Sequence, residues 1–157
     1  MMVTLEPTGA SGADWTNPSN ALVEDAAVAI NASGTGWLKF ALSGTIEPEL
    51  ELVSYQIRSV CGVVVSGPAP LIGEDETVRL EFGLSKDAGV TAFGDTQLVD
   101  AYNVIIEKEL LMVTDLSAWD AADFNSTDFR ILVRRPVDAS EAACDRLVDS
   151  LVLEAMH

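Results

Sequence analysis

The segment LELVSYQIRSVCGVVV, residues 50–65, alternates between two sets of side chains. Every second residue from Leu50 to Gln56 falls on one face of an extended chain, and Val53, Tyr55 and Ile57 fall on the other. Successive side chains of a β-strand leave opposite faces of the sheet, so a period of two predicts a strand rather than a helix. The segment is long enough for one bent strand or for two.

The same period recurs along the chain, separated by short clusters of turn-forming residues. Comparable segments lie at residues 26–32, 37–43, 77–85, 103–112, 129–135 and 148–156. Gly and Pro residues between these segments indicate turns at residues 34–36, 66–70, 87–89 and 94–95. About eight strands at these spacings are typical of sandwiches and barrels. We therefore expect an all-β fold, an antiparallel and jelly-roll-like β-sandwich with at most one short helix.

Two segments depart from this pattern. Residues 138–147, DASEAACDRL, favour a helix that Ser140 could cap, and the alternative is a polar loop with one helical turn. Residues 1–13 are rich in Gly, Ala, Thr and Ser, which predicts a flexible N-terminal arm. Residues 14–157 are then expected to form a single β-sandwich domain, as the length of 157 residues suits one core.

Charge is the strongest compositional feature, with 25 acidic residues against 9 basic ones and a net charge of −16. A phosphate backbone would be repelled by such a surface, so we expect no nucleic-acid partner. No apolar run reaches the roughly 20 residues of a bilayer span, and the N-terminus lacks a secretion signal. We therefore expect a soluble chain with no membrane partner.

The residues that usually carry catalysis are sparse. The single histidine is His157, the last residue, and no glycine-rich phosphate loop precedes a helix. Cys61 and Cys144 match no zinc or redox spacing, so we expect two buried thiols, with a disulfide as the alternative. The sequence therefore predicts a non-enzymatic protein with no catalytic, cofactor-binding or metal-binding residue.

Acidic residues crowd one late segment and could hold Ca²⁺, although we favour a solvated loop whose side chains form turns. The segment contains Asp115, Asp120, Asp123, Asn125 and Asp128. A second run, Glu74 to Glu76, could in principle supply a carboxylate pair for glycoside hydrolysis, but nothing sets a working separation. The glycosylation triplets at Asn31 and Asn125 are expected to be turn residues.

The stretch DWTNPSNA, residues 14–21, places a tryptophan before a polar turn. Asn17 precedes a proline and is expected to be extended, Pro18 fixes its own φ, and Asn20 can bond neighbouring backbone. This rigid turn predicts that Trp15 folds as a lid over one end of the sandwich, since such a ring buries about 150–250 Å².

The block WTNPSNA at residues 15–21 is followed by Asp25, and the late segments are DLSAW at 115–119 and DFNSTDFRILV at 123–133. In this order they resemble a β-sandwich domain common in tailed-bacteriophage structural proteins. The resemblance runs from residue 15 to the end, although Arg130 stands where that family usually has glycine.

This resemblance implies a non-enzymatic virion protein, most concretely a capsid decoration or cement protein that bridges major capsid subunits on the capsid surface. It would be made in the host cytoplasm, and a homotrimer would suit the role. Small size, a loose arm and an acidic surface favour a head position. The alternatives are a tail or head-to-tail module, or a carbohydrate-binding module in which Trp15, Trp37 or Trp119 stacks on sugar rings. For Trp37 a half-buried core role is expected instead.

Overall fold

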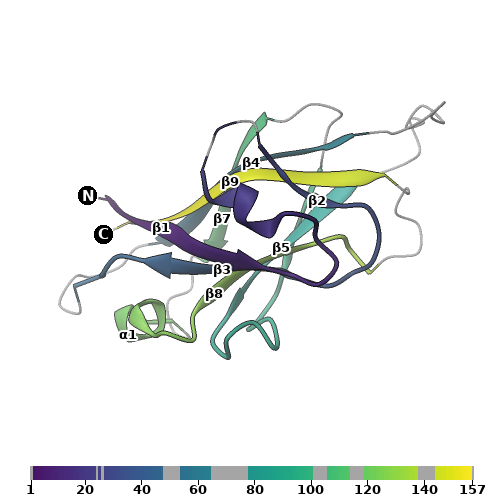
Figure 1. The fold of residues 1–157 in the computed structure, drawn as a ribbon. Coiled ribbons are helices and arrows are strands. Elements are labelled where there is room, and N and C mark those ends of the chain that lie inside the picture. The colour runs from purple at the N-terminus through teal and green to yellow at the C-terminus, as the bar shows by residue number, and fades with distance from the viewer. Residues whose placement is uncertain are drawn as a thin grey trace.

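The computed structural model describes residues 2–23, 25, 27–47, 54–64, 78–100, 106–113, 119–137 and 144–156. Within these residues the chain forms strands that all pair antiparallel, with one 3-10 helix and one short α-helix (Figure 1). The strands are β1 Met2–Ser11, β2 Ala29–Asn31, β3 Leu38–Ser43, β4 Ser54–Val64, β5 Arg79–Ser85, β6 Gln97–Asp100, β7 Ile106–Val113, β8 Arg130–Arg134 and β9 Asp145–Met156. The helices are η1 Pro18–Leu22 and α1 Ala121–Asn125. The all-β prediction is confirmed.

The strands follow the order β6-β5-β8-β3-β1-β9-β4-β7, and β2 adds to β9. The sheet curls so that β9, β4 and β7 form one layer and β3, β8, β5 and β6 the other, which makes a β-sandwich (Figure 1). The strand β1 serves both layers: its first half pairs with β9 and its second half with β3. The register breaks between Pro7 and Gly9, where a proline without an N–H group is tolerated.

The prediction of a flexible arm over residues 1–13 is wrong, because residues 2–11 form β1 in the middle of the sheet. The polar composition hid a period of two in which Val3 and Leu5 face inward, and Leu5 is fully buried. Partners on both sides satisfy the backbone of β1, which composition alone cannot reveal.

The alternating segment at residues 50–65 forms one strand, β4, over residues 54–64, while residues 50–53 and 65 lie outside the described residues. Its register with β9 shifts between Val60 and Cys61, so it is one bent strand rather than two. The strands β3, β5, β7, β8 and β9 also coincide with predicted segments, and β2 is shorter than predicted. The four-residue strand β6 was not predicted.

The helix predicted at residues 138–147 is wrong at its C-terminal end, since Asp145–Met156 is the strand β9. Leu147 pairs with Ile30 on one side and Gly62 on the other, and this double pairing overrides local helix preference. Residues 138–143 lie outside the described residues. The α-helix occurs instead at α1, where Asp120 and Asp123 form a reciprocal capping box.

Trp15 closes one end of the core, as predicted. Its side chain is 5% exposed, and Nε1 donates to the carbonyl of Gly36 at 3.1 Å. The turn behind it differs from the prediction: Asn17 is left-handed, with φ 50° and ψ 57°, rather than extended. Asparagine enters this region more easily than most residues, and Pro18 then starts η1.

Candidate functional site

The three tryptophans differ in how much surface they keep. Trp15 and Trp119 are 5% and 6% exposed and belong to the hydrophobic core. Trp37 is half-buried and lies outside that core. Because Leu38 and Phe40 are fully buried, alternation along the strand places Trp37 on the outer face of the sheet, so the expected core role is wrong.

Arg134 lies against the ring of Trp37. Its Cζ atom is 3.9 Å from the ring centroid, a cation–π contact. The register explains the contact, because Leu38 pairs with Val133 and thereby places Trp37 beside Arg134. The indole also lies beside Gly83: a Cβ atom there would be in ordinary contact with Cη2 of Trp37 at 3.8 Å and in tight contact with Cγ2 of Thr96 at 3.2 Å.

Glu81 fixes the orientation of Arg134. Nε of Arg134 donates to Oε1 at 3.1 Å and Nη2 donates to Oε2 at 2.8 Å, a bidentate pair with a buried carboxylate. Such paired bonds set the plane of the guanidinium group as well as its position. Nη1 stays on the opposite edge, and no residue in the described part of the chain accepts a hydrogen bond from it.

These side chains form a row across the sheet. Leu98 on β6 pairs with Glu81, Glu81 pairs with Arg134, and Arg134 lies beside Trp37. Leu98 is 48% exposed. We call Trp37, Glu81, Leu98 and Arg134 the Trp37 platform.

The Trp37 platform lies at the end of the sandwich remote from the chain termini. Met2 pairs with Met156, whereas the other end of β1, Ser11, pairs with Lys39, two residues from Trp37. The nine-residue step along β1 corresponds to about 30 Å at the usual rise of a strand. Figure 1 shows both termini on the same side of the molecule.

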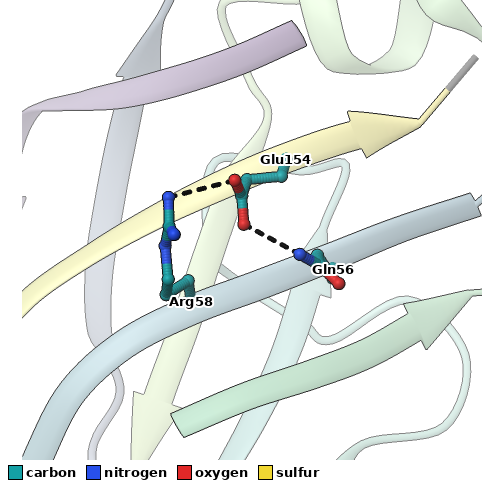
Figure 2. A network of polar contacts seen from close by, with 3 residues as sticks. All are labelled: Gln56, Arg58 and Glu154. Atoms are coloured by element: carbon teal, nitrogen blue, oxygen red, sulfur yellow. Dashed lines mark hydrogen bonds and ion pairs between the residues drawn. The ribbon is translucent and has the colours of Figure 1, made fainter. Parts of the chain in front are cut away.

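A second polar cluster lies on the outer face of the other layer (Figure 2). Glu154 on β9 accepts from Nε2 of Gln56 at 2.8 Å and from Nη2 of Arg58 at 3.0 Å. The carboxylate is buried, while the Arg58 side chain is 39% exposed. Both oxygens of Glu154 are engaged, and none of the described aromatic rings lies against Arg58. The cluster orients Arg58 but offers no described stacking surface.

A third cluster surrounds Trp119 at the end that bears α1. Trp119 packs on Phe124 and Phe129, and the 43% exposed Phe93 meets its edge with centroids 5.3 Å apart. Nζ of Lys86 lies 4.2 Å from the Phe93 centroid and 4.6 Å from that of Trp119. The ammonium group therefore already lies over both of these rings.

The acidic segment at residues 115–128 is organised by turns where it is described. Asp120 and Asp123 cap α1, and Nζ of Lys86 lies 3.2 Å from Oδ2 of Asp123. The Asn125 amide exchanges hydrogen bonds with the backbone of Ile46 at 2.9 and 2.8 Å. No group of three or more acidic, His or Cys side chains suited to a metal ion occurs within the described ranges. Asp115, Glu74 to Glu76 and His157 lie outside them.

The remaining predicted groups are buried or engaged. Cys61 and Cys144, both described, are buried thiols that no disulfide joins. The side chain of Asn31 is fully buried, and its Nδ2 donates to the carbonyl of Asp14 at 3.2 Å. A glycosylation enzyme could not reach Asn31 in the folded chain.

Among the described residues, two side chains have displaced pKa values. Burial raises the pKa of Tyr55 above its ordinary value, and the charges of Asp123 and Asp120 add to the shift. Hydrogen bonds from Ser85 and Thr91 lower the pKa of Asp87 to about 2. The same hydrogen bonds fix the β5–β6 loop. Ala92 and Thr96 of this loop lie over Gly83, beside the Trp37 platform.

Comparison with known proteins identifies the fold. No family model and no curated protein sequence matches the chain. Two structures of the lectin domain of Lectinolysin, both in complex with Lewis b antigen and one a His 62 mutant, superpose with TM-scores of 0.53 and 0.52 at 12% identity. The matches cover 97% and 94% of this chain and 94% and 92% of theirs. A low-affinity xylan-binding module from Roseburia intestinalis gives a TM-score of 0.44 at 14% identity, covering 99% of this chain and 92% of the module. The chain therefore shares the lectin-domain β-sandwich.

None of these findings bears on the virion hypothesis. The capsid-decorating role, the major capsid partner, the homotrimer and the virion location stay predictions, as does the absence of catalysis. The loose arm that favoured a head position is replaced by β1. No helix in the described part of the chain is long and apolar enough to cross a membrane.

Sequence reasoning named Trp37 as a possible sugar-stacking residue but missed Glu81 and Arg134. The available signal was alternation: Leu80 and Phe82 are core residues, which places Glu81 on the outer face of a predicted strand. The pairing of residues 53 positions apart depends on the register between β5 and β8, which no local pattern specifies.

Proposed function

We propose that the protein is a carbohydrate-binding module and that the Trp37 platform is its sugar-contacting surface. The observation that carries the proposal is that Trp37 alone among the three tryptophans keeps exposed surface, on an outer face, beside an orientation-fixed arginine. Trp15 and Trp119 are too deeply buried to meet a ligand without unfolding part of the core.

The platform combines the groups that a sugar ring requires. An indole offers a large, rigid apolar surface for the C–H face of a pyranose, while N–H donors at its edge can bond hydroxyl oxygens. Nη1 of Arg134 is such a donor, and the bidentate bond to Glu81 fixes it before the ligand arrives. Preorganised donors lower the ordering cost of binding.

The fold supports the proposal without deciding it. The two lectin-domain structures that share this sandwich were determined with Lewis b bound, as their names state. Because one fold hosts many functions, the platform supports the proposal more than the likeness does. Nothing in the platform resembles an acid–base pair for hydrolysis, since Glu81 already accepts both hydrogen bonds from Arg134.

A glycan array followed by titration calorimetry tests the proposal. The wild-type chain is expected to bind at least one glycan class, and Trp37→Ala is expected to weaken that binding about 10-fold, which corresponds to the loss of about 1.4 kcal/mol of aromatic contact. Phe93→Ala is the matched control, because Phe93 is a 43% exposed aromatic that packs on Trp119 rather than on Trp37. Far-ultraviolet circular dichroism should show that both variants keep the β-fold.

Two results contradict the proposal. Equal glycan affinity for Trp37→Ala and the wild-type chain would remove the platform from the site. A wild-type chain that binds nothing on the array would remove the function itself.

A further inference from the structure

We propose that the glycan recognised at the Trp37 platform is anionic, a sugar that bears a carboxylate or a sulfate. The inference rests on the proposed function and adds the chemical class of the ligand. It comes from the balance of hydrogen-bond donors, acceptors and charge around Trp37.

Two cationic side chains near Trp37 have donors without a described acceptor. Nη1 of Arg134 has no acceptor among the described residues. Lys39 lies two residues after Trp37 on the same outer face and is half-buried, and no described residue forms an ion pair with its ammonium group. The stem of Lys39 is held by the β5–β6 loop, since a Cβ atom on Gly89 would lie 2.6 Å from its Cδ.

The Glu81 carboxylate is fully engaged, and Asp14 near the start of β3 is engaged through one oxygen. Glu81 accepts two hydrogen bonds from Arg134, and Oδ2 of Asp14 accepts the N–H of Gly36 at 2.7 Å. The described residues therefore offer the ligand two cationic donors, Nη1 of Arg134 and Nζ of Lys39, that no described carboxylate engages. A ligand group with only acceptor oxygens and a negative charge is the chemical complement.

The wider charge distribution agrees with this inference. The molecule carries −16, with only nine basic residues. Four of the nine alternate with core residues and therefore lie on the outer face of β3, β5 and β8. They are Lys39, Arg79, Arg130 and Arg134. Outward strand positions of the same layer hold two acids, Glu81 and Asp100, each paired across the sheet with an arginine. Basic residues are therefore concentrated on this face, whereas the acidic remainder of the surface would repel an anion.

Matched glycan pairs test the inference. The pairs are sialyllactose with lactose, oligogalacturonides with their methyl esters, and a sulfated disaccharide with its unsulfated parent. At least one acidic member is expected to bind about tenfold more tightly than its neutral partner, the size of one charge-assisted hydrogen bond. The preference should shrink at 0.5 M salt, because exposed charges are screened there. The carboxylate and sulfate arms separate the two chemical sources.

A pair of lysine variants locates the effect. Lys39→Met keeps the packed stem but removes the charge, and it is expected to reduce the acidic preference at least threefold. Lys86→Gln is the control, because the ammonium group of Lys86 is engaged by Asp123 and lies over Phe93 and Trp119; this variant should leave the preference unchanged. Thermal unfolding of both variants should show that the fold is retained.

Each outcome has one meaning. Acidic and neutral members that bind equally would overturn the anionic assignment and leave the proposed function in place. An acidic preference that Lys39→Met does not change would also overturn it, because the preference would arise elsewhere. Absence of binding to every member would overturn the proposed function and the anionic assignment together.

Discussion

Trp15 and Trp37 have the same side chain, but its removal is expected to have different effects at the two positions. The ring of Trp15 is enclosed at the end of the core and its Nε1 is bonded to Gly36, so removal leaves a cavity. Trp37 lies on the outside against Arg134, so removal exposes a surface instead. The first residue contributes to stability and the second, by our account, to binding.

Substitution of Trp15 by alanine is expected to lower the free energy of unfolding by about 3–5 kcal/mol, the usual cost of truncating a large buried aromatic. Denaturant titration measures this loss. Trp37→Ala, in the same titration, should lose clearly less, since part of its ring already faces water. Equal losses for the two variants would contradict the assignment of Trp37 to the surface.

Asp87 should respond to acid in a defined window. Its pKa is about 2 in the folded chain against 3.8 ordinarily, because Ser85 and Thr91 bond its ionised form. Folding therefore favours the charged carboxylate: its contribution is fully present above about pH 4 and is lost as the pH falls toward 2. A carboxyl titration by nuclear magnetic resonance should give this low pKa. An ordinary midpoint near 3.8 would show that the hydrogen bonds do not form.

Among the elements, β1 is the strand that both layers share. It pairs with β9 through Met2–Leu5 and with β3 through Glu6–Ser11, and so it joins the two layers along one strand. The small and polar residues that predicted a flexible arm are instead part of this strand. Its pairing register shifts near the middle, between Pro7 and Gly9.

Deletion of residues 2–11 is therefore expected to abolish the cooperative thermal unfolding transition, since it exposes two sheet edges and uncovers the core around Leu5. Circular dichroism and calorimetry would measure the loss. A deletion variant that keeps a β-spectrum and a cooperative transition would show that β1 is dispensable, as a loose arm would be.

The sequence allowed prediction of the strands whose period of two is strong, above all β4, β5 and β8. It did not allow prediction of β1, whose inward residues are few, or of β6, which has four residues. The start of β9 was mistaken for helix because Ala and Glu precede it, whereas pairing with β2 and β4 decides its conformation. For the site, exposure of a tryptophan could be proposed from sequence, but the Glu81–Arg134 pair required the register of distant strands.

At the scale of the whole molecule, the platform and the termini lie at opposite ends of the sandwich. A tag or surface linkage at either terminus therefore leaves Trp37 accessible, which simplifies binding experiments. The resemblance to phage structural domains stays a separate prediction about where the module is displayed, and it is compatible with a sugar-binding surface that faces outward.

The most direct test is a ¹H–¹⁵N correlation spectrum recorded during titration with the tightest-binding glycan. The chain has three tryptophans and so three indole N–H signals, which single Trp→Phe variants assign. The account predicts that the Trp37 signal shifts with ligand in a saturable manner, while the signals of buried Trp15 and Trp119 barely move. A saturable shift of the Trp119 or Trp15 signal, with that of Trp37 unchanged, would contradict it.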